Sequence, residues 1–189
     1  TRDCKNFWID IRRGLLRAPV DRIGLGGYLH LVEDYPDFVN YIETLAQEFR
    51  ILREAHQHGK PYVAPFKVAV LTAWGKLRSW ICNGHFIHGL ALNELLESLA
   101  GLPVDVEFLS FDDILDQGIP ADVRVIINCG QVGSAWCGGE HWKNTAILET
   151  ITGWVANGSG FIGIEEPSAC EHTNRYFQLA DVLGVDREI

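Results

Sequence analysis

Residues 67–74 read KVAVLTAW, a continuous apolar run that is rich in β-branched side chains. Such a run is typical of a strand in a parallel sheet that helices cover on both faces, because neither face then has to be polar. We therefore predict that residues 67–74 form a central strand of an α/β fold.

Helical and strand-like patterns alternate beyond this run. Residues 90–99 place four leucines on one helical face, and Gly101 and Pro103 follow where a glycine and a proline commonly end a helix. Residues 104–111 alternate apolar and polar side chains, which indicates a strand with one wetter face or a place near the sheet edge. Further strands are expected at residues 123–128 and 161–164, the second short and buried, and a helix at residues 146–155. Together these elements predict an open, mostly parallel sheet with helices on both faces.

The N-terminal part of the chain has a different pattern. Residues 20–27 read VDRIGLGG, which predicts a short buried strand that ends in glycines, where the backbone turns tightly or approaches a ligand. Pro36 can occupy the first turn of a helix, and apolar side chains then recur every three or four residues for about five turns, up to Gly59 and Pro61. The apolar positions of this predicted amphipathic helix are Phe38, Tyr41, Ile42, Leu45, Phe49 and Leu52.

The residues around this helix end are the most linker-like of the chain, with His58, Gly59, Pro61 and Pro65 close together. We therefore predict three parts. They are residues 1–58 with the strand and the long helix, a linker at residues 59–66, and an α/β domain at residues 67–189.

Composition excludes several classes of function. The 189 residues carry a formal net charge of −9, and Lys and Arg do not cluster, which argues against a nucleic-acid partner. No run of eighteen apolar residues occurs and residues 1–5 show no targeting signal, so we predict no membrane association. The five cysteines are odd in number and have no repeating spacing, which favours a reducing compartment, the cytoplasm, over a disulfide framework.

Ligands of open α/β sheets bind beyond the carboxyl ends of the strands, so the segments that follow the predicted strands are the candidate ligand sites. Lys76 and Arg78 follow the first strand and could clamp an anion, although cations in loops are more often solvated. No G-x-G-x-x-G motif follows a strand, and His85 and His88 have no supporting metal-ligand spacing. The sequence therefore predicts no cofactor and no metal.

Cys129 stands at the tip of the strand at residues 123–128, a place that resembles the nucleophile elbow of class I glutamine amidotransferases. That elbow requires a glycine where Ile127 stands and a later His-x-Glu, whereas this chain has Glu171 followed by His172. A small apolar residue packed at a strand end is the alternative interpretation of Cys129, and the more common one. A metal site could be assembled on paper from Cys129, Cys137, His141, Cys170 and His172, but no ligand spacing supports it.

Glu165 and Glu166 form a carboxylate pair at the end of the last predicted strand. One of them could cap a helix or bind a cation. Because neighbouring residues of a strand point to opposite faces, we expect that the two do not act together as acid and base on one bond.

Three segments resemble the 1,3-β-galactosyl-N-acetylhexosamine (lacto-N-biose) phosphorylases. They are residues 11–29 (IRRGLLRAPVDRIGLGGYL), residues 70–80 (VLTAWGKLRSW), and residues 154–186 with GFIGIEEPSA and YFQLADVLGVD. The resemblance implies a catalytic (β/α)₈ barrel that ends in this chain, with its eighth strand at residues 22–28 and its last helix at residues 37–56. It also implies that a central α/β domain similar to the glutamine-amidotransferase fold follows.

The reaction that the resemblance implies is a reversible, inverting phosphorolysis of a β-1,3-linked galactosyl-N-acetylhexosamine. Inorganic phosphate replaces the water of a hydrolase, so phosphate is a substrate and a single carboxylic acid suffices. In the family this acid is an aspartate on an earlier barrel strand, to which no residue here corresponds. We therefore expect the general acid upstream of Thr1, and expect this chain alone to be inactive and to serve mainly as scaffold and subunit contact.

Three residues near the predicted last barrel strand are candidates for binding sugar or phosphate, because the active sites of barrels lie at the carboxyl ends of the strands. Tyr28 follows the glycines directly and is the first candidate, and Arg22 and Arg17 are the next, although each arginine could instead form a structural ion pair. The expected partners are the disaccharide, phosphate and further copies of the chain in a homo-oligomer. Two other interpretations remain open, a Cys-dependent amidotransferase-like enzyme and a non-catalytic oligomerisation domain whose partner surface would use Trp74, Trp80, Trp136 and Trp142.

Overall fold

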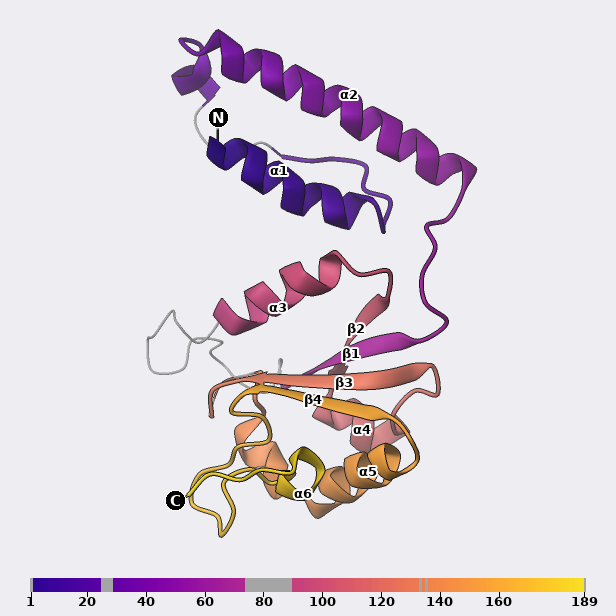
Figure 1. Cartoon of the computed structure of the whole chain (residues 1–189), viewed down its shortest axis with the longest axis vertical. Helices are drawn as coiled ribbons and strands as arrows, with labels where there is room; N and C mark the ends of the chain where they lie inside the picture. The colour runs from indigo at the N-terminus through magenta and orange to yellow at the C-terminus, as the bar shows by residue number, and fades with distance from the viewer. Residues whose placement is uncertain (1, 25–28, 74–89, 133, 135, 189) are drawn as a thin grey trace. The chain divides into compact units, whose positions relative to one another are not determined.

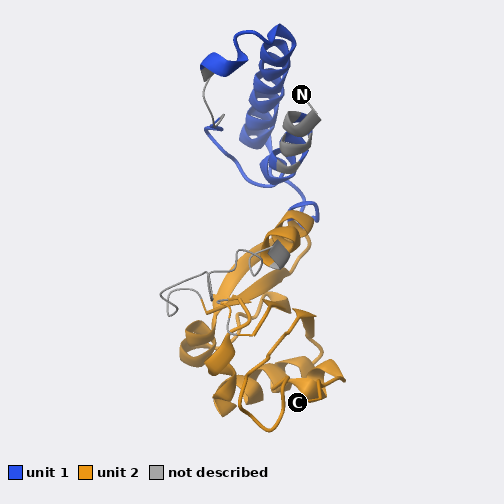
Figure 2. Cartoon of the chain, turned by 90° about the vertical axis from the view of Figure 1, so that its left-hand side faces the viewer, with its two compact units in different colours: residues 1–63, 100–103 blue, residues 64–99, 104–189 orange. Residues whose placement is uncertain are grey.

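A computed structural model describes residues 2–24, 29–73, 90–132, 134 and 136–188 (Figure 1). The chain divides into two compact units, which Figure 2 shows in separate colours. One unit comprises Thr1–Val63 with Ala100–Pro103, and the other comprises Ala64–Leu99 with Val104–Ile189. No helix in the described part of the chain is both long and apolar enough to cross a membrane.

The second unit is built on a parallel sheet of four strands in the order β2-β1-β3-β4. Strand β1 pairs with β2 from Lys67↔Asp105 onward on one side, and with β3 on the other. The predicted central position of the apolar run is therefore confirmed, and so is the α/β class. The strands are β1 (Lys67–Thr72), β2 (Asp105–Ser110), β3 (Val123–Gly130) and β4 (Gly160–Glu165).

Helices cover both faces of this sheet, as the alternation of strands and helices predicted. Figure 1 shows α3 on one face and α4 and α5 on the other. The helices and 3₁₀ turn of this unit are α3 (Leu90–Ala100), α4 (Phe111–Gln117), η4 (Gly139–Lys143), α5 (Thr145–Ala156) and α6 (Ala180–Leu183).

Two hydrophobic cores result, because successive side chains of a strand point to opposite faces. Ala69 and Leu71 of β1 lie in the core that contains residues of α4 and α5, whereas Val68 and Val70 lie in the core on the α3 side. The continuous apolar run at residues 67–74 is thus explained, since β1 needs apolar side chains on both faces.

Helix α4 was not predicted. Its start is a capping box, in which the Ser110 hydroxyl accepts from the Asp113 amide at 3.0 Å and the Asp113 carboxylate accepts from the Ser110 amide at 3.0 Å. Phe111 was assigned to the preceding strand, but it is the first residue of the helix and is 1% exposed. The motif S-x-x-D was the signal in the sequence that would have separated the two elements.

The prediction that residues 161–164 form a buried strand was partly wrong. The strand exists as β4, but it lies at the edge of the sheet and pairs only with β3 among the described strands. Ile162 is 47% exposed as a result. The other edge was predicted correctly, because β2 lies there and its Phe108 is 57% exposed.

The first unit consists of α1 (Arg2–Leu15), the short turn η1 (Leu29–Val32) and α2 (Pro36–His58). The predicted long helix is confirmed as α2, with Pro36 in its first turn and Gly59 as its cap. Helix α1 was not predicted. Each of the six apolar positions predicted for the long helix is half-buried, at Phe38, Tyr41, Ile42, Leu45, Phe49 and Leu52.

Polar contacts join α1 to α2. The Glu48 carboxylate accepts from the Trp8 indole at 2.8 Å and pairs with the Arg12 guanidinium at 2.8 Å. At the far end of the helix pair, the His56 ring contacts the backbone oxygen of Leu15 at 2.6 Å. Trp8 and Leu15 are both buried, so apolar packing and polar pairing occur along the same seam.

The strand predicted at residues 20–27, and the eighth barrel strand expected at residues 22–28, are not formed in the described part. Residues 19–24 have no strand conformation, and residues 25–28 lie outside the described residues. A strand needs a neighbour to accept its backbone hydrogen bonds, and the described residues of this unit contain no other strand.

A single buried side chain joins three backbone segments at the carboxyl end of β3. The Asn128 amide group donates to the backbone oxygens of Trp136 and Cys137, at 2.9 and 3.1 Å, and its side-chain oxygen accepts from the Ser168 amide at 2.7 Å. Asn128 is completely buried. Removing it would leave three buried backbone groups without this partner, where water cannot easily replace it.

We expect Asn128→Ala to lower the free energy of unfolding by about 3 kcal/mol, because buried polar groups lose their hydrogen bonds. The matched control is Asn144→Ala, which removes the exposed N-cap of α5 and should cost about 1 kcal/mol. Urea unfolding followed by tryptophan fluorescence measures both values. Equal costs for the two variants would show that the buried network does not hold the loops together.

Candidate functional site

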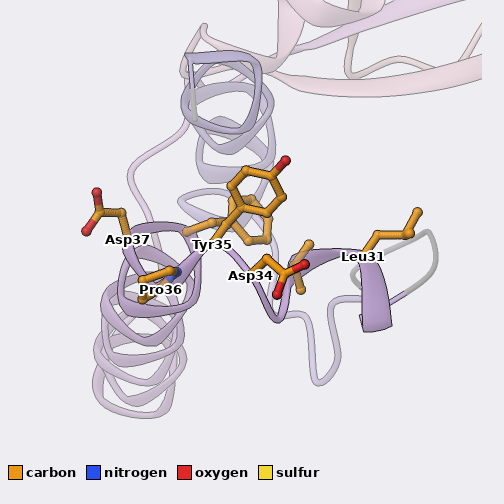
Figure 3. A pocket seen from close by; sticks show the side chains of 7 residues that line it. Leu31, Asp34, Tyr35, Pro36 and Asp37 are labelled. Atoms are coloured by element: carbon orange, nitrogen blue, oxygen red, sulfur yellow. The ribbon is translucent and has the colours of Figure 1, made fainter.

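A pocket of about 510 Å³ lies where η1 meets α2 (Figure 3). The segment that forms it is held by local hydrogen bonds, because the Tyr35 amide donates to the Val32 oxygen at 3.0 Å and the Phe38 amide donates to the Tyr35 oxygen at 2.9 Å. Pro36 suits the first helical position, where no backbone donor is needed. The pocket is lined by Leu31, Val32, Asp34, Tyr35, Pro36, Asp37 and Phe38.

The chemistry of this lining is suited to a ligand rich in hydroxyl groups. Asp34 and Asp37 supply carboxylates and Tyr35 a phenol, while Leu31 and Phe38 supply apolar surface. In Figure 3 the Asp34 carboxylate lies between Tyr35 and Leu31, and the Asp37 carboxylate points away from both. Carboxylates accept strong hydrogen bonds from hydroxyl groups, and no Lys or Arg is among the described lining residues, so the lining itself does not favour an anion.

The structure does not bring the predicted candidates into this lining. Arg17 lies half-buried in the turn after α1, where its amide donates to the Gly14 oxygen at 3.0 Å. Arg22 is exposed in the irregular segment that follows. Neither arginine lines the pocket, and Tyr28 lies outside the described residues.

Asp34, Tyr35 and Asp37 were not among the residues singled out from the sequence. The signal was their position, because Asp34 and Tyr35 stand between the predicted barrel strand and the long helix, and Asp37 is in the first turn of that helix. Such a segment would be a loop at the carboxyl end of a barrel strand. The sequence E-D-Y-P-D at residues 33–37 concentrates acidic groups there.

The residues singled out after β1 belong to the segment 74–89, which the described ranges do not include. Lys76, Arg78, His85 and His88 all lie outside the described residues. Trp74 and Trp80 lie outside them as well, whereas Trp142 is fully buried and Trp136 is 8% exposed. Trp142 therefore does not belong to an exposed partner surface in the described part of the unit.

Cys129 is completely buried in the core on the α3 side. Burial, together with the nearby Glu165 carboxylate, raises the pKa of the Cys129 thiol from 9.0 to about 11. An activated nucleophile needs the opposite shift, since the thiolate is the reactive form. The structure thus favours the interpretation of Cys129 as a small apolar residue packed at a strand end.

Cys137 is also buried, and its thiol donates to the backbone oxygen of Glu166 at 3.0 Å. Burial raises the pKa of the Cys137 thiol to about 12. Among the described residues there is no group of three or more His, Cys, Asp and Glu side chains that could hold a metal ion. His141 instead stacks on Phe111, with the ring centroids 4.8 Å apart.

The two carboxylates at the carboxyl end of β4 have different surroundings. Glu166 pairs with the Arg187 guanidinium at 2.6 Å and accepts from the Val132 amide at 2.9 Å. Glu165 is exposed and has a positive φ of 66°. Glu166 thus ties the segment after β3 to the C-terminal residues, a structural role.

Comparisons with known proteins agree with this two-part chain. A family model described as the lacto-N-biose phosphorylase N-terminal TIM barrel domain matches residues 1–64, and one described as the lacto-N-biose phosphorylase central domain matches residues 67–189. The fold is therefore that of a barrel end joined to the central α/β domain of a phosphorylase. The chain belongs to the lacto-N-biose phosphorylase family, as the resemblance predicted.

Curated relatives match along the whole chain or nearly so. A D-galactosyl-β-1→4-L-rhamnose phosphorylase from Lachnoclostridium phytofermentans is 52% identical over 100% of this chain, which covers 26% of that protein. A 1,3-β-galactosyl-N-acetylhexosamine phosphorylase from the same organism is 44% identical over 100% of this chain and 27% of the relative. Another from Bifidobacterium longum subsp. longum is 43% identical over 96% of this chain and 25% of the relative. The chain thus spans about a quarter of the length of these relatives.

We predict that Cys129 and Cys137 resist alkylation by iodoacetamide in the folded protein at neutral pH and react fully in denaturant. Burial keeps both thiols protonated and out of contact with the reagent. Folding raises the pKa of the Cys129 thiol from 9.0 to about 11, so the free energy of unfolding should contain a favourable contribution from this thiol below pH 9.0. That contribution should be lost as the pH rises from 9.0 toward about 11. Peptide mass spectrometry locates the labelled cysteines. Rapid labelling of Cys129 under native conditions would restore the nucleophile interpretation.

Proposed function

We propose that the full-length protein carries out reversible, inverting phosphorolysis of a β-galactoside and releases α-galactose 1-phosphate. The membership of the family supports this proposal most directly, since its curated members are named as phosphorylases of galactosyl disaccharides. This chain would contribute the last βα loop of the barrel, and the remainder of the barrel would supply the general acid.

In the proposed reaction a phosphate oxygen attacks the anomeric carbon of the galactosyl unit. The bond from that carbon to the glycosidic oxygen breaks as the general acid protonates the leaving oxygen, and the second sugar departs as an alcohol. The acidic pocket at residues 31–38 is suited to the sugar side of this reaction, because Asp34 can accept hydrogen bonds from sugar hydroxyls. The proposed contacts for the sugar or the phosphate dianion remain Tyr28, Arg22 and Arg17. The two arginines carry a positive charge, which no described lining residue of the pocket carries.

Two leaving sugars are proposed. An N-acetylhexosamine in β-1,3 linkage follows from the family description and from the relatives at 44% and 43% identity. L-rhamnose in β-1,4 linkage is the second candidate, because the relative with that name is 52% identical. The galactosyl unit is common to both, so the two candidates differ only in what the leaving-group side of the site must recognise.

We also propose that the protein forms a homo-oligomer and acts in a reducing compartment, the cytoplasm. The second part of this proposal is supported by Cys129, Cys137 and Cys170, which are buried and free of disulfide bonds. The α/β domain would then serve mainly as scaffold and subunit contact.

The proposed reaction predicts phosphate-dependent release of galactose 1-phosphate by the full-length protein. The test compares galactosyl-β-1,3-N-acetylglucosamine, galactosyl-β-1,3-N-acetylgalactosamine and galactosyl-β-1,4-L-rhamnose, each with and without phosphate. Preference for the third over the first two by at least about tenfold in kcat/KM would assign the rhamnose branch. If none of the three released galactose 1-phosphate, the proposed function would be wrong.

Asp34→Asn in the full-length protein should lower kcat/KM for the preferred disaccharide by about 10- to 100-fold, the loss expected for a hydrogen bond to a charged group. Glu33→Gln is the matched control, because it removes the same charge from the adjacent exposed residue, which does not line the pocket. Steady-state kinetics on both variants give kcat/KM. Equal kcat/KM values for Asp34→Asn and Glu33→Gln would show that the pocket does not contribute to the reaction.

A further inference from the structure

The strand order of the α/β domain defines a second place where a ligand can bind. The chain passes from β1 to β2 on one side of β1, and from β2 it crosses to β3 on the other side. The carboxyl ends of β1 and β3 therefore flank the topological switch point, where open parallel sheets bind their ligands because the connections leave in opposite directions.

A cavity of about 540 Å³ lies at this end of the sheet. Thr72 is the last residue of β1 and Trp136 follows β3, so the cavity borders the switch point that the topology defines. Phe108, Ser110 and Asp113 extend it past the end of β2. Its volume is within the range of about 300 to 1,000 Å³ that is usual for small-molecule sites. The described lining residues are Thr72, Leu92, Phe108, Ser110, Asp113 and Trp136.

Two aromatic rings are among the residues that line the cavity. Phe108 is 57% exposed although it is a large apolar side chain, and Trp136 is 8% exposed. Phe108 stands on the edge strand β2 and Trp136 beyond β3, so the rings come from opposite sides of β1. An exposed ring beside a cavity offers a flat surface on which the C–H face of a ligand can pack.

The polar groups of the cavity are hydroxyls and one carboxylate. The Asp113 Oδ2 atom accepts from the Ser110 amide at 3.0 Å and from the Ser110 hydroxyl at 2.6 Å. Both of these hydrogen bonds use Oδ2, so Oδ1 is the carboxylate atom that can accept from a ligand. The hydrogen bonds from Ser110 lower the pKa of Asp113, so the group is a carboxylate at neutral pH. The described lining residues thus combine one carboxylate with the hydroxyl groups of Thr72 and Ser110, and a carboxylate accepts strong hydrogen bonds from hydroxyl donors.

We propose that this cavity of the α/β domain binds a neutral sugar, with its C–H face on Phe108 and its hydroxyl groups on Asp113 and Thr72. A sugar combines an apolar face with a ring of hydroxyl donors, and this combination matches an aromatic wall beside a carboxylate and a hydroxyl. The cavity shares no lining residue with the pocket at residues 31–38. The binding is independent of phosphorolysis, so it can be found whether or not the proposed reaction occurs.

The test is hydrogen–deuterium exchange of the full-length protein, titrated without phosphate with galactose, N-acetylglucosamine or L-rhamnose. We expect at least one sugar to slow exchange saturably in peptides that cover residues 105–113 and 136–142. Phe108→Ala and Asp113→Asn should each raise the midpoint of this protection by about tenfold or more, the effect of losing a contact of ordinary strength. The mass shift is read peptide by peptide, so binding in the barrel does not obscure the result.

Matched controls use the same chemistry away from the cavity. Ile162→Ala truncates an exposed apolar residue on the other edge strand, and Asp116→Asn removes a charge from an exposed residue of α4. Both should keep the midpoint of the unchanged protein. The proposal fails if no sugar protects these peptides, or if Phe108→Ala and Asp113→Asn keep the unchanged midpoint. Protection by tetramethylammonium but by none of the sugars would also overturn it, since the site would then bind an organic cation on its carboxylate and rings.

Discussion

The buried amide of Asn128 is the contact on which the carboxyl end of the sheet depends. It joins the tip of β3 to the backbone of Trp136, Cys137 and Ser168, and all three of its hydrogen bonds are made out of reach of water. The backbone around Trp136 is therefore set by β3 itself, and with it one wall of the switch-point cavity. A loop held in this way can present an aromatic ring without regular secondary structure of its own.

The two units place their pockets by different physical means. In the α/β domain, helices pack against both faces of β1 and β3 through two hydrophobic cores. The switch-point cavity is therefore positioned by buried strands. In the first unit, the pocket at residues 31–38 is formed by a turn and the first residues of α2, and the helix pair is joined by Glu48 and by Trp8 and Leu15. Helix α2 itself has no fully buried residue. An apolar helical face of this kind suits the outer ring of a barrel, where neighbouring elements share in burying it.

Much of the α/β domain was predictable, because its signals are local. The run at residues 67–74 predicted a central strand, and the leucines of residues 90–99 predicted a helix with one apolar face. The exceptions have clear causes. Phe111 continued the alternation of the preceding strand, so the capping box at Ser110 was overlooked, and the apolar residues at 161–164 indicated burial although Ile162 is exposed at an edge. The acidic pocket was missed because Asp34 and Asp37 form no motif with known spacing, and only a turn followed by a helix places both residues in the lining of one pocket.

The sequence by itself determined the class of the fold, the long helix from Pro36 and the family. Periodicity, helix-ending residues and long shared motifs are all local signals, because each is formed by residues close together in the chain. Only the tertiary structure decided which strands became edges, that the thiol of Cys129 is buried and protonated, and that Phe108, Asp113 and Trp136 line one cavity. These features depend on which segment accepts a strand's hydrogen bonds and on what covers a side chain. Both are properties of residues far apart in the chain, so no local pattern can specify them.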